Sequence, residues 1–115
     1  MDQLLNVVAE TTADAHILSV DGEVDLSTAA TLEQAVTAAI DQAEPALVIV
    51  DLARVRFLSS SGISTLLKAR QHGDDGGVAL RLVVPPDAVM RRALEVTGML
   101  DVLPIYPDLD SALAG

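Results

Sequence analysis

The sequence predicts an α/β domain in which helices pack against a mixed, mostly parallel β-sheet. Short apolar runs with strand-like patterns alternate with segments of helical period, half of the 115 residues are apolar, and this length is usual for one compact domain. Alternating strands and helices favour parallel strands joined by right-handed crossovers. We therefore expect a single domain over residues 1–115, with the element order β-β-α-β-α-β-α-β-α.

Two strands, over residues 4–10 and 15–20, open the predicted domain, and a turn over residues 11–14 joins them. The second strand combines partial alternation with β-branched residues. This opening hairpin makes an otherwise parallel sheet mixed. Asp21-Gly22 is a typical turn signal, so we expect a turn directly after the second strand.

From Ser27 onward the apolar spacing is that of an amphipathic helix. Its apolar face consists of Ala29, Leu32, Val36, Ala39 and Ile40. Asp25 or Ser27 is of the right type to cap the open N–H groups at the helix start. The helix should stop before Pro45, because the residue before a proline is biased away from helical geometry.

A continuous apolar run over residues 46–50 is typical of a strand covered on both faces. Residues 51–58 then lead to Ser59-Ser60-Ser61-Gly62, where a second helix begins. We expect that helix to end near Gly73, with residues 74–77 as a loop. Its inward-facing residues are Ile63, Leu66 and Leu67.

The last third of the chain predicts a strand over residues 78–84, a third helix opened by residues 85–87, a short strand over residues 102–106, and a last helix through Leu113. Gly98 is a plausible end signal for the third helix, and Asp108 is the expected cap of the last one. The apolar contacts of the third helix should come from Val89, Met90, Ala93, Leu94 and Met99.

Charge and composition exclude several classes of function. Seventeen acidic residues against seven basic ones give a net charge of −10, and the basic residues form no long run, which argues against direct binding of nucleic acid. The acidity serves either solubility or attraction to a basic patch on a protein partner. The absence of cysteine excludes disulfides and thiolate metal sites.

Apolar segments are too short for membrane insertion. Residues 46–50 form the longest apolar run, whereas a membrane-spanning helix needs about 20 apolar residues. No secretory signal pattern stands at the N-terminus. We therefore expect a cytoplasmic protein that does not insert into a membrane, either a monomer or a weak dimer.

The most informative segment leads from a buried strand to Ser59-Ser60-Ser61-Gly62 at a helix start. Helix starts carry unpaired N–H groups and a partial positive charge, which favour an anion. A hydroxyl there can accept a phosphoryl group, which adds about −1.5 to −2 charges near neutral pH, without disturbing the core. The same residues also form an ordinary helix cap, and on their own they leave both interpretations open.

The wider pattern resembles the phosphorylation-site segment of bacterial anti-sigma-factor antagonists, members of the STAS domain family. There the pattern is Asp-Leu, an apolar residue, Phe, another apolar residue, and then Asp-Ser-Ser/Thr-Gly-Leu. The matching residues here are Asp51-Leu52, Val55, Phe57-Leu58 and Ser60-Ser61-Gly62-Ile63. Gly22-Glu23-Val24-Asp25 and residues 88–100, with Thr97-Gly98-Met99-Leu100, resemble two further family segments, so the resemblance covers nearly the whole chain.

This resemblance implies a binding protein that acts by partner switching and has no catalytic residue, metal or cofactor. The unphosphorylated antagonist binds an anti-sigma factor, usually a serine kinase, and so releases a sigma factor. Phosphorylation by that partner breaks the complex, and a phosphatase resets it. The family's phosphorylatable serine falls on Ser60, with Ser61 as second and Ser59 as third candidate; Ser59 stands where the family has Asp.

The family's partner surface is the loop before its first helix and the start of its second. Carried over, it consists of Glu23, Asp25, Ser60, Ser61, Gly62 and Ser64. Structural alternatives remain open for three of these: Asp25 as a helix cap, Gly62 as a close-packing position, and Ser64 as solvated surface.

Rival functions find less support in the residues. A serine hydrolase needs a base near its nucleophile, and neither His16 nor His72 is well placed for that role; the Gly-x-Ser-x-Gly pattern is also absent. A phosphate-binding loop or a metal site lacks its residues, and a receiver domain would need carboxylates clustered around Asp51. The remaining alternative is a STAS subunit of another assembly, such as a lipid-transport complex, without serine phosphorylation.

Overall fold

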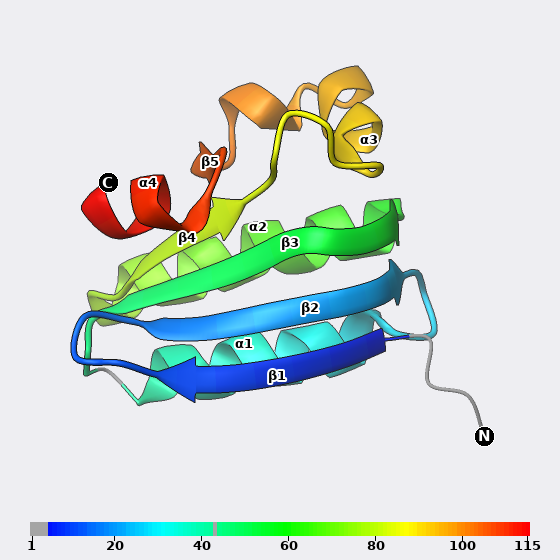
Figure 1. Cartoon of the computed structure of the whole chain (residues 1–115). Helices are drawn as coiled ribbons and strands as arrows, with labels where there is room; N and C mark the ends of the chain where they lie inside the picture. The colour runs from blue at the N-terminus through cyan, green and yellow to red at the C-terminus, as the bar shows by residue number, and fades with distance from the viewer. Residues whose placement is uncertain (1–4, 43) are drawn as a thin grey trace.

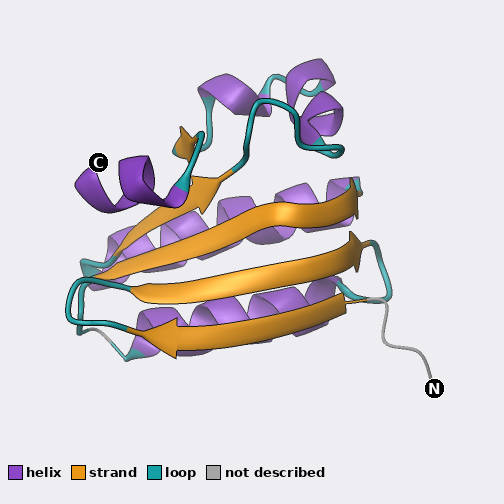
Figure 2. Ribbon diagram, in the orientation of Figure 1, coloured by secondary structure: helices purple, strands orange, loops and turns teal. Residues whose placement is uncertain are grey.

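The computed structural model describes residues 5–42 and 44–115, which form a five-stranded sheet with helices packed on it (Figures 1 and 2). The predicted order of strands and helices is confirmed, with one short 3-10 helix added. Leu4, the first residue of the predicted first strand, lies outside the described residues. The elements are β1 Leu5–Thr11, β2 His16–Val24, α1 Ala29–Asp41, β3 Leu47–Leu58, α2 Ser60–Gly76, β4 Ala79–Val83, α3 Arg91–Val96, η1 Met99–Asp101, β5 Ile105–Tyr106 and α4 Leu109–Ala114.

The strands lie in the spatial order β1-β2-β3-β4-β5. β1 pairs antiparallel with β2, and all further neighbours pair in parallel, which confirms the predicted mixed, mostly parallel sheet. Parallel strands present their carboxyl ends at one edge of a sheet. The end of β2, which leads to α1, and the end of β3, which leads to α2, therefore meet at the same edge (Figure 1).

Helices α1 and α2 cover one face of the sheet and enclose its main core (Figure 2). As the composition predicts, this core is aliphatic; fully buried members include Leu18, Leu32, Val50, Leu52, Leu66 and Leu82. On the other face, α4 contributes Ala112 to a smaller cluster with Ile49 of β3 and Val83 of β4. In Figure 1 the outward face of β1 and β2 lies toward the viewer with no described helix in front of it.

The C-terminal ends predicted from the sequence for β2 and β3 are wrong. Asp21-Gly22 forms no turn: β2 continues to Val24, and shifts in its pairing register with β3 lie on either side of this pair. Gly22 takes a φ of 129°, which lets the strand accommodate the irregularity. β3 continues beyond the apolar run to Leu58, because Leu52, Val55 and Leu58 still place buried side chains in the core.

Both long helices also differ from their predicted ends. α1 begins at Ala29 instead of Ser27, because residues 25–28 form a hydrogen-bonded turn before it. α2 extends to Gly76, so the predicted loop over residues 74–77 is mostly helix. Gly73 is buried within it, and the helix ends where Gly77 adopts a left-handed conformation, with φ of 73°.

The C-terminal third contains less regular structure than predicted. Residues 86–87 and 89–90 form turns, so α3 begins only at Arg91. Val89, which was predicted to supply an apolar contact, is 73% exposed. β5 has only two residues of the strand predicted over residues 102–106. Gly98, with φ of 74°, follows α3, which confirms it as the end signal of that helix. The Asp108 carboxylate accepts a hydrogen bond from the Ser111 N–H at 2.7 Å, which confirms it as the cap at the start of α4.

The start of α2 packs closely against the ends of β2 and β3 at Gly62. A Cβ atom built on Gly62 would lie 2.5 Å from Leu58 Cδ1 and 2.7 Å from Val24 Cγ1, well inside contact distance. Both neighbours are buried core residues, and Val24 is β-branched with little rotamer freedom. The absence of a side chain at Gly62 therefore sets how near α2 lies to the sheet.

We expect Gly62→Ala to destabilise the fold by about 1–2 kcal/mol, because overpacking the core outweighs the gain in helix propensity. Urea unfolding followed by circular dichroism measures the change. Gly76→Ala is the matched control: it lies in the same helix, nothing lies within 4 Å of its added Cβ, and we expect it to be neutral or stabilising. A Gly62→Ala variant as stable as the wild type would contradict the close-packing role.

Candidate functional site

The ends of β2 and β3 bring two sequence-predicted segments together. In the strand register Glu23 lies opposite Phe57, and Val24 opposite Leu58. The Ser59 N–H then donates a hydrogen bond to Val24 O at 2.8 Å, which ties the start of α2 to the end of β2. We call the surface formed by residues 23–28 and 57–64 the serine edge; it lies at the arrowheads of β2 and β3 in Figure 1.

The loop before α1 is held by a compact set of hydrogen bonds. Asp25 Oδ1 accepts from the Ser27 N–H at 2.9 Å, the Ser27 hydroxyl at 2.7 Å and the Thr28 N–H at 3.1 Å. The Thr28 hydroxyl donates to Glu23 O at 2.8 Å and accepts from the Asp25 N–H at 2.9 Å. The side chain that caps the approach to α1 is therefore that of Asp25.

These bonds also determine the charge of Asp25. The hydrogen bond from the Ser27 hydroxyl is the largest cause that lowers the pKa of the Asp25 carboxyl below its ordinary value, and the Ser27 and Thr28 N–H groups act in the same direction. Asp25 is thus ionised at neutral pH. The loop therefore presents a negative charge in a defined position.

The three serines at the start of α2 are in different environments. Ser59 is the N-cap: its Oγ accepts from the Gly62 N–H at 3.3 Å, its carbonyl accepts from the Ile63 N–H at 3.0 Å, and it is half-buried. Ser61 is also half-buried. Ser60 is exposed, and its hydroxyl makes no hydrogen bond to another described residue.

The remaining predicted site residues lie on or directly beneath the same edge. Glu23 and Asp25 are half-buried, and Ser64 is exposed on α2. Gly62 is buried, so it contributes to this surface by positioning α2 and not by offering contact area. The fold thus brings together every residue that the family resemblance nominates.

Two apolar residues at the serine edge are exposed, which the sequence pattern did not predict. Leu26, in the loop before α1, is 83% exposed, and Phe57, near the end of β3, is 50% exposed. Leu26 stands out in the sequence only as an apolar residue inside a polar turn. Phe57 could not be placed by alternation, because Val55 and Leu58 are both buried and the face toward which Phe57 points depends on the irregular register of β3.

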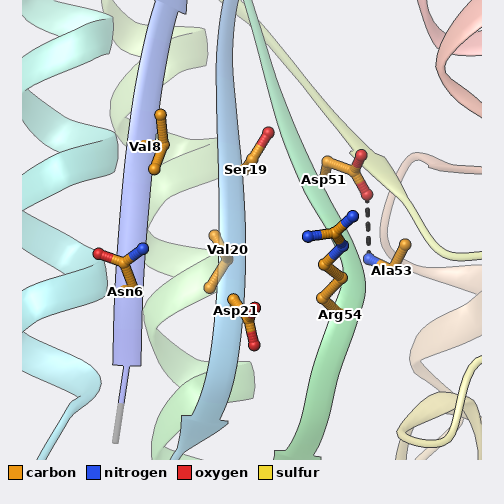
Figure 3. Close-up of a pocket in the computed structure, with 8 residues that line it drawn as sticks. All are labelled: Asn6, Val8, Ser19, Val20, Asp21, Asp51, Ala53 and Arg54. Carbon is orange, nitrogen blue, oxygen red and sulfur yellow. Dashed lines mark hydrogen bonds between the residues drawn. The ribbon is translucent and has the colours of Figure 1, made fainter. Parts of the chain in front are cut away.

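A shallow groove of about 300 Å³ lies on the open face of the sheet, on the side opposite α1 and α2 (Figure 3). Asp51 Oδ1 accepts from the Ala53 N–H at 3.0 Å within it, and the side chain of Arg54 lies beside them. Asp21 pairs with Arg56 at 3.1 Å, and both side chains are well exposed. The groove is lined by strand residues upstream of the serine edge and contains none of the serines at the start of α2.

The two histidines have partners remote from Ser60. His16 is buried at the start of β2, where Nδ1 lies 3.0 Å from Thr11 Oγ1 and Nε2 donates to Glu44 O at 3.0 Å. His72 Nε2 lies 2.7 Å from Asp41 Oδ1, between α2 and α1. Neither is placed to act as a base for Ser60.

Residues 5–42 and 44–115 contain neither a cluster of metal ligands nor a membrane-spanning helix. No three His, Asp or Glu side chains among them come together as a metal site. None of their helices combines the length and the apolar character that crossing a membrane requires.

Comparison with known proteins identifies the family of this chain. The STAS domain model matches residues 6–112. The anti-sigma-F factor antagonist RsfB of Mycobacterium tuberculosis is 32% identical over 100 residues, which cover 86% of this chain and 79% of RsfB. The anti-sigma-F factor antagonist RsfA of the same organism is 31% identical over 101 residues, covering 87% of this chain and 78% of RsfA.

A solved structure is similar over nearly the whole chain. The crystal structure of an anti-sigma factor antagonist from Mycobacterium paratuberculosis superposes with a TM-score of 0.83 at 32% identity, covering 96% of this chain and 92% of that chain. Sequence and fold thus agree, and the chain belongs to the STAS domain family.

Proposed function

We propose that this protein is an anti-sigma-factor antagonist that binds an anti-sigma factor through the serine edge and is released by phosphorylation of Ser60. The observation that carries the proposal is the exposed, unengaged hydroxyl of Ser60 at the start of α2, next to the fixed loop of Asp25. Binding frees a sigma factor for transcription. We expect the protein to act in the cytoplasm as a monomer or weak dimer. The anti-sigma factor would be the serine kinase, and a phosphatase would remove the phosphate.

The local structure favours Ser60 over its neighbours as the phosphate acceptor. The Ser59 oxygen already caps α2, and Ser61 is half-buried. A phosphate on Ser60 would lie at the positive end of a helix dipole, so the helix itself would tolerate the modification. The ranking Ser60, Ser61, Ser59 is thereby supported by burial and hydrogen bonding as well as by the family pattern.

Loss of binding would follow from the bulk and charge of the phosphate and would need no change of fold. A phosphoserine carries about −1.5 to −2 charges near neutral pH. Burying such a group in an interface without an opposite charge is strongly unfavourable. Phosphorylation can therefore separate the two proteins while leaving the antagonist folded.

Ser59 in place of the family's Asp leaves one alternative function open, a STAS subunit of another assembly, such as a lipid-transport complex, that is not phosphorylated. The acidic neighbour of the acceptor serine is missing, although the cap is kept. Phosphoryl transfer to Ser60 discriminates between these functions.

We expect Ser60→Ala to retain binding within about twofold and Ser60→Asp to weaken it at least about tenfold, since only Asp adds charge to the interface. The measurement is calorimetric titration against purified anti-sigma factors of the anti-sigma-F class, the class that RsfB antagonises. Ser19→Asp, which places the same charge on the exposed face of β2, is the control and should bind like the wild type. Equal affinities of the two Ser60 variants would refute the switch.

Incubation with the cognate anti-sigma kinase and ATP should transfer one phosphate to Ser60. Mass spectrometry of peptides identifies the modified residue, and Ser60→Ala should remain unmodified. Phosphate on Ser59 or Ser61 in the wild type would show that the acceptor is assigned wrongly. No transfer from a kinase that binds the protein would favour the unphosphorylated assembly subunit.

Ser59→Ala should lower the free energy of unfolding by about 1 kcal/mol through loss of the cap, whereas Ser59→Asp should leave stability nearly unchanged. Aspartate is an equally good N-cap, and its charge interacts favourably with the helix start. Urea unfolding of both variants checks this pair of outcomes. A Ser59→Asp variant as unstable as Ser59→Ala would show that the side chain at this position does not serve as the cap.

A further inference from the structure

We propose that Leu26 and Phe57 are the apolar anchors through which the serine edge holds its partner, an anti-sigma factor with a complementary apolar surface. This inference rests on the proposed function and names the residues that supply its binding energy. It starts from their exposure: 83% for Leu26, and 50% for Phe57, the single phenylalanine of a chain whose core is aliphatic.

Both residues flank the contact that joins the two segments of the serine edge. Leu26 follows Val24 by two residues, and Phe57 precedes Ser59 by two residues, while Val24 O accepts the Ser59 N–H at 2.8 Å. Ser60 follows directly on the α2 side of that bond. A partner surface that spans this contact can therefore reach Leu26, Phe57 and Ser60 together.

The backbone presents both side chains in fixed positions. Leu26 lies within the turn that the Asp25 carboxylate and the Thr28 hydroxyl hold together. Phe57 belongs to β3 and is paired in register with Glu23 of β2. Because the backbone around them is already ordered, binding costs less conformational entropy than it would on a mobile loop.

A few residues supply most of the binding energy in protein interfaces; aromatic residues are enriched at the buried centre, and polar groups surround them. The serine edge has this composition, with Leu26 and Phe57 beside Glu23, Asp25 and Ser64. Oδ1 of Asp25 is occupied in holding its own turn, so this carboxylate serves the shape of the loop as well as its charge. Val8, Val89 and Val102 are also exposed, but they lie outside the serine edge and are of the scattered kind found on most surfaces. Leu67, which the sequence pattern placed inward, is 37% exposed on α2, beyond the residues of the serine edge.

The anchors also account for the direction of the switch. If the partner covers Ser60 with apolar surface, a phosphate on Ser60 meets no opposite charge there and must lose its hydration to remain in the interface. A basic partner surface would instead attract the phosphate. The apolar surroundings therefore favour release of the partner on phosphorylation.

The test is titration of Leu26→Ala and Phe57→Ala against the anti-sigma factor that the wild type binds. We expect each to weaken binding about tenfold or more, which is the loss typical of an interface anchor. Val8→Ala, an exposed apolar residue on the open face of β1, is the matched control and should change affinity less than about twofold. Leu26→Met and Phe57→Leu, which keep apolar contact area, should recover most of the affinity.

Stability measurements exclude unfolding as the cause, since truncation of exposed side chains should leave the thermal midpoint of each variant close to that of the wild type. Wild-type affinity for both alanine variants, together with a Ser60→Asp variant that still weakens binding, would overturn the anchors and leave the proposed function standing. Failure of the wild type to bind any anti-sigma factor would overturn the proposed function and the anchors with it.

Discussion

The contact between the end of β2 and the start of α2 is the constraint on which the serine edge depends. The Ser59 N–H donates to Val24 O, and the missing side chain of Gly62 lets α2 approach Val24 and Leu58. Val24 precedes the turn of Asp25, and Ser59 precedes Ser60, so one contact positions both segments. Surfaces built from two separate loops lose entropy when they are ordered by a partner, and this surface is ordered in advance.

The side chains of Asp25, Ser27, Thr28 and Ser59 hold this edge together through hydrogen bonds, and that of Ser60 does not. The oxygens of Asp25, Thr28 and Ser59 all take part in hydrogen bonds to the backbone of the same two segments. Modification of any of them would loosen the surface itself. A group added to Ser60 changes what the surface presents and leaves its supports intact, as a local electrostatic switch on a stable domain requires.

The existence and order of the elements could be predicted from the sequence, because short apolar runs mark the longer strands and helical periodicity marks both long helices. The ends of these elements could not be predicted, because residues typical of turns also occur inside strands and helices. Asp21-Gly22 has the composition of a turn, yet Gly22 uses its conformational freedom within β2. The nominated site residues were found through the family pattern. Phe57 belongs to that pattern, but neither it nor Leu26 could be predicted as exposed, since their exposure depends on strand register and on a turn that only the folded chain defines.

The substitution of Ser59 for the family's aspartate separates two roles that one residue can hold. Capping α2 requires an oxygen that accepts the Gly62 N–H, and serine and aspartate supply it about equally well. A negative charge next to Ser60 is a different property, and only aspartate supplies it. Exchanging aspartate for serine here therefore leaves the stability of the fold nearly unchanged. Any consequence must arise from how another protein interacts with the charge beside Ser60.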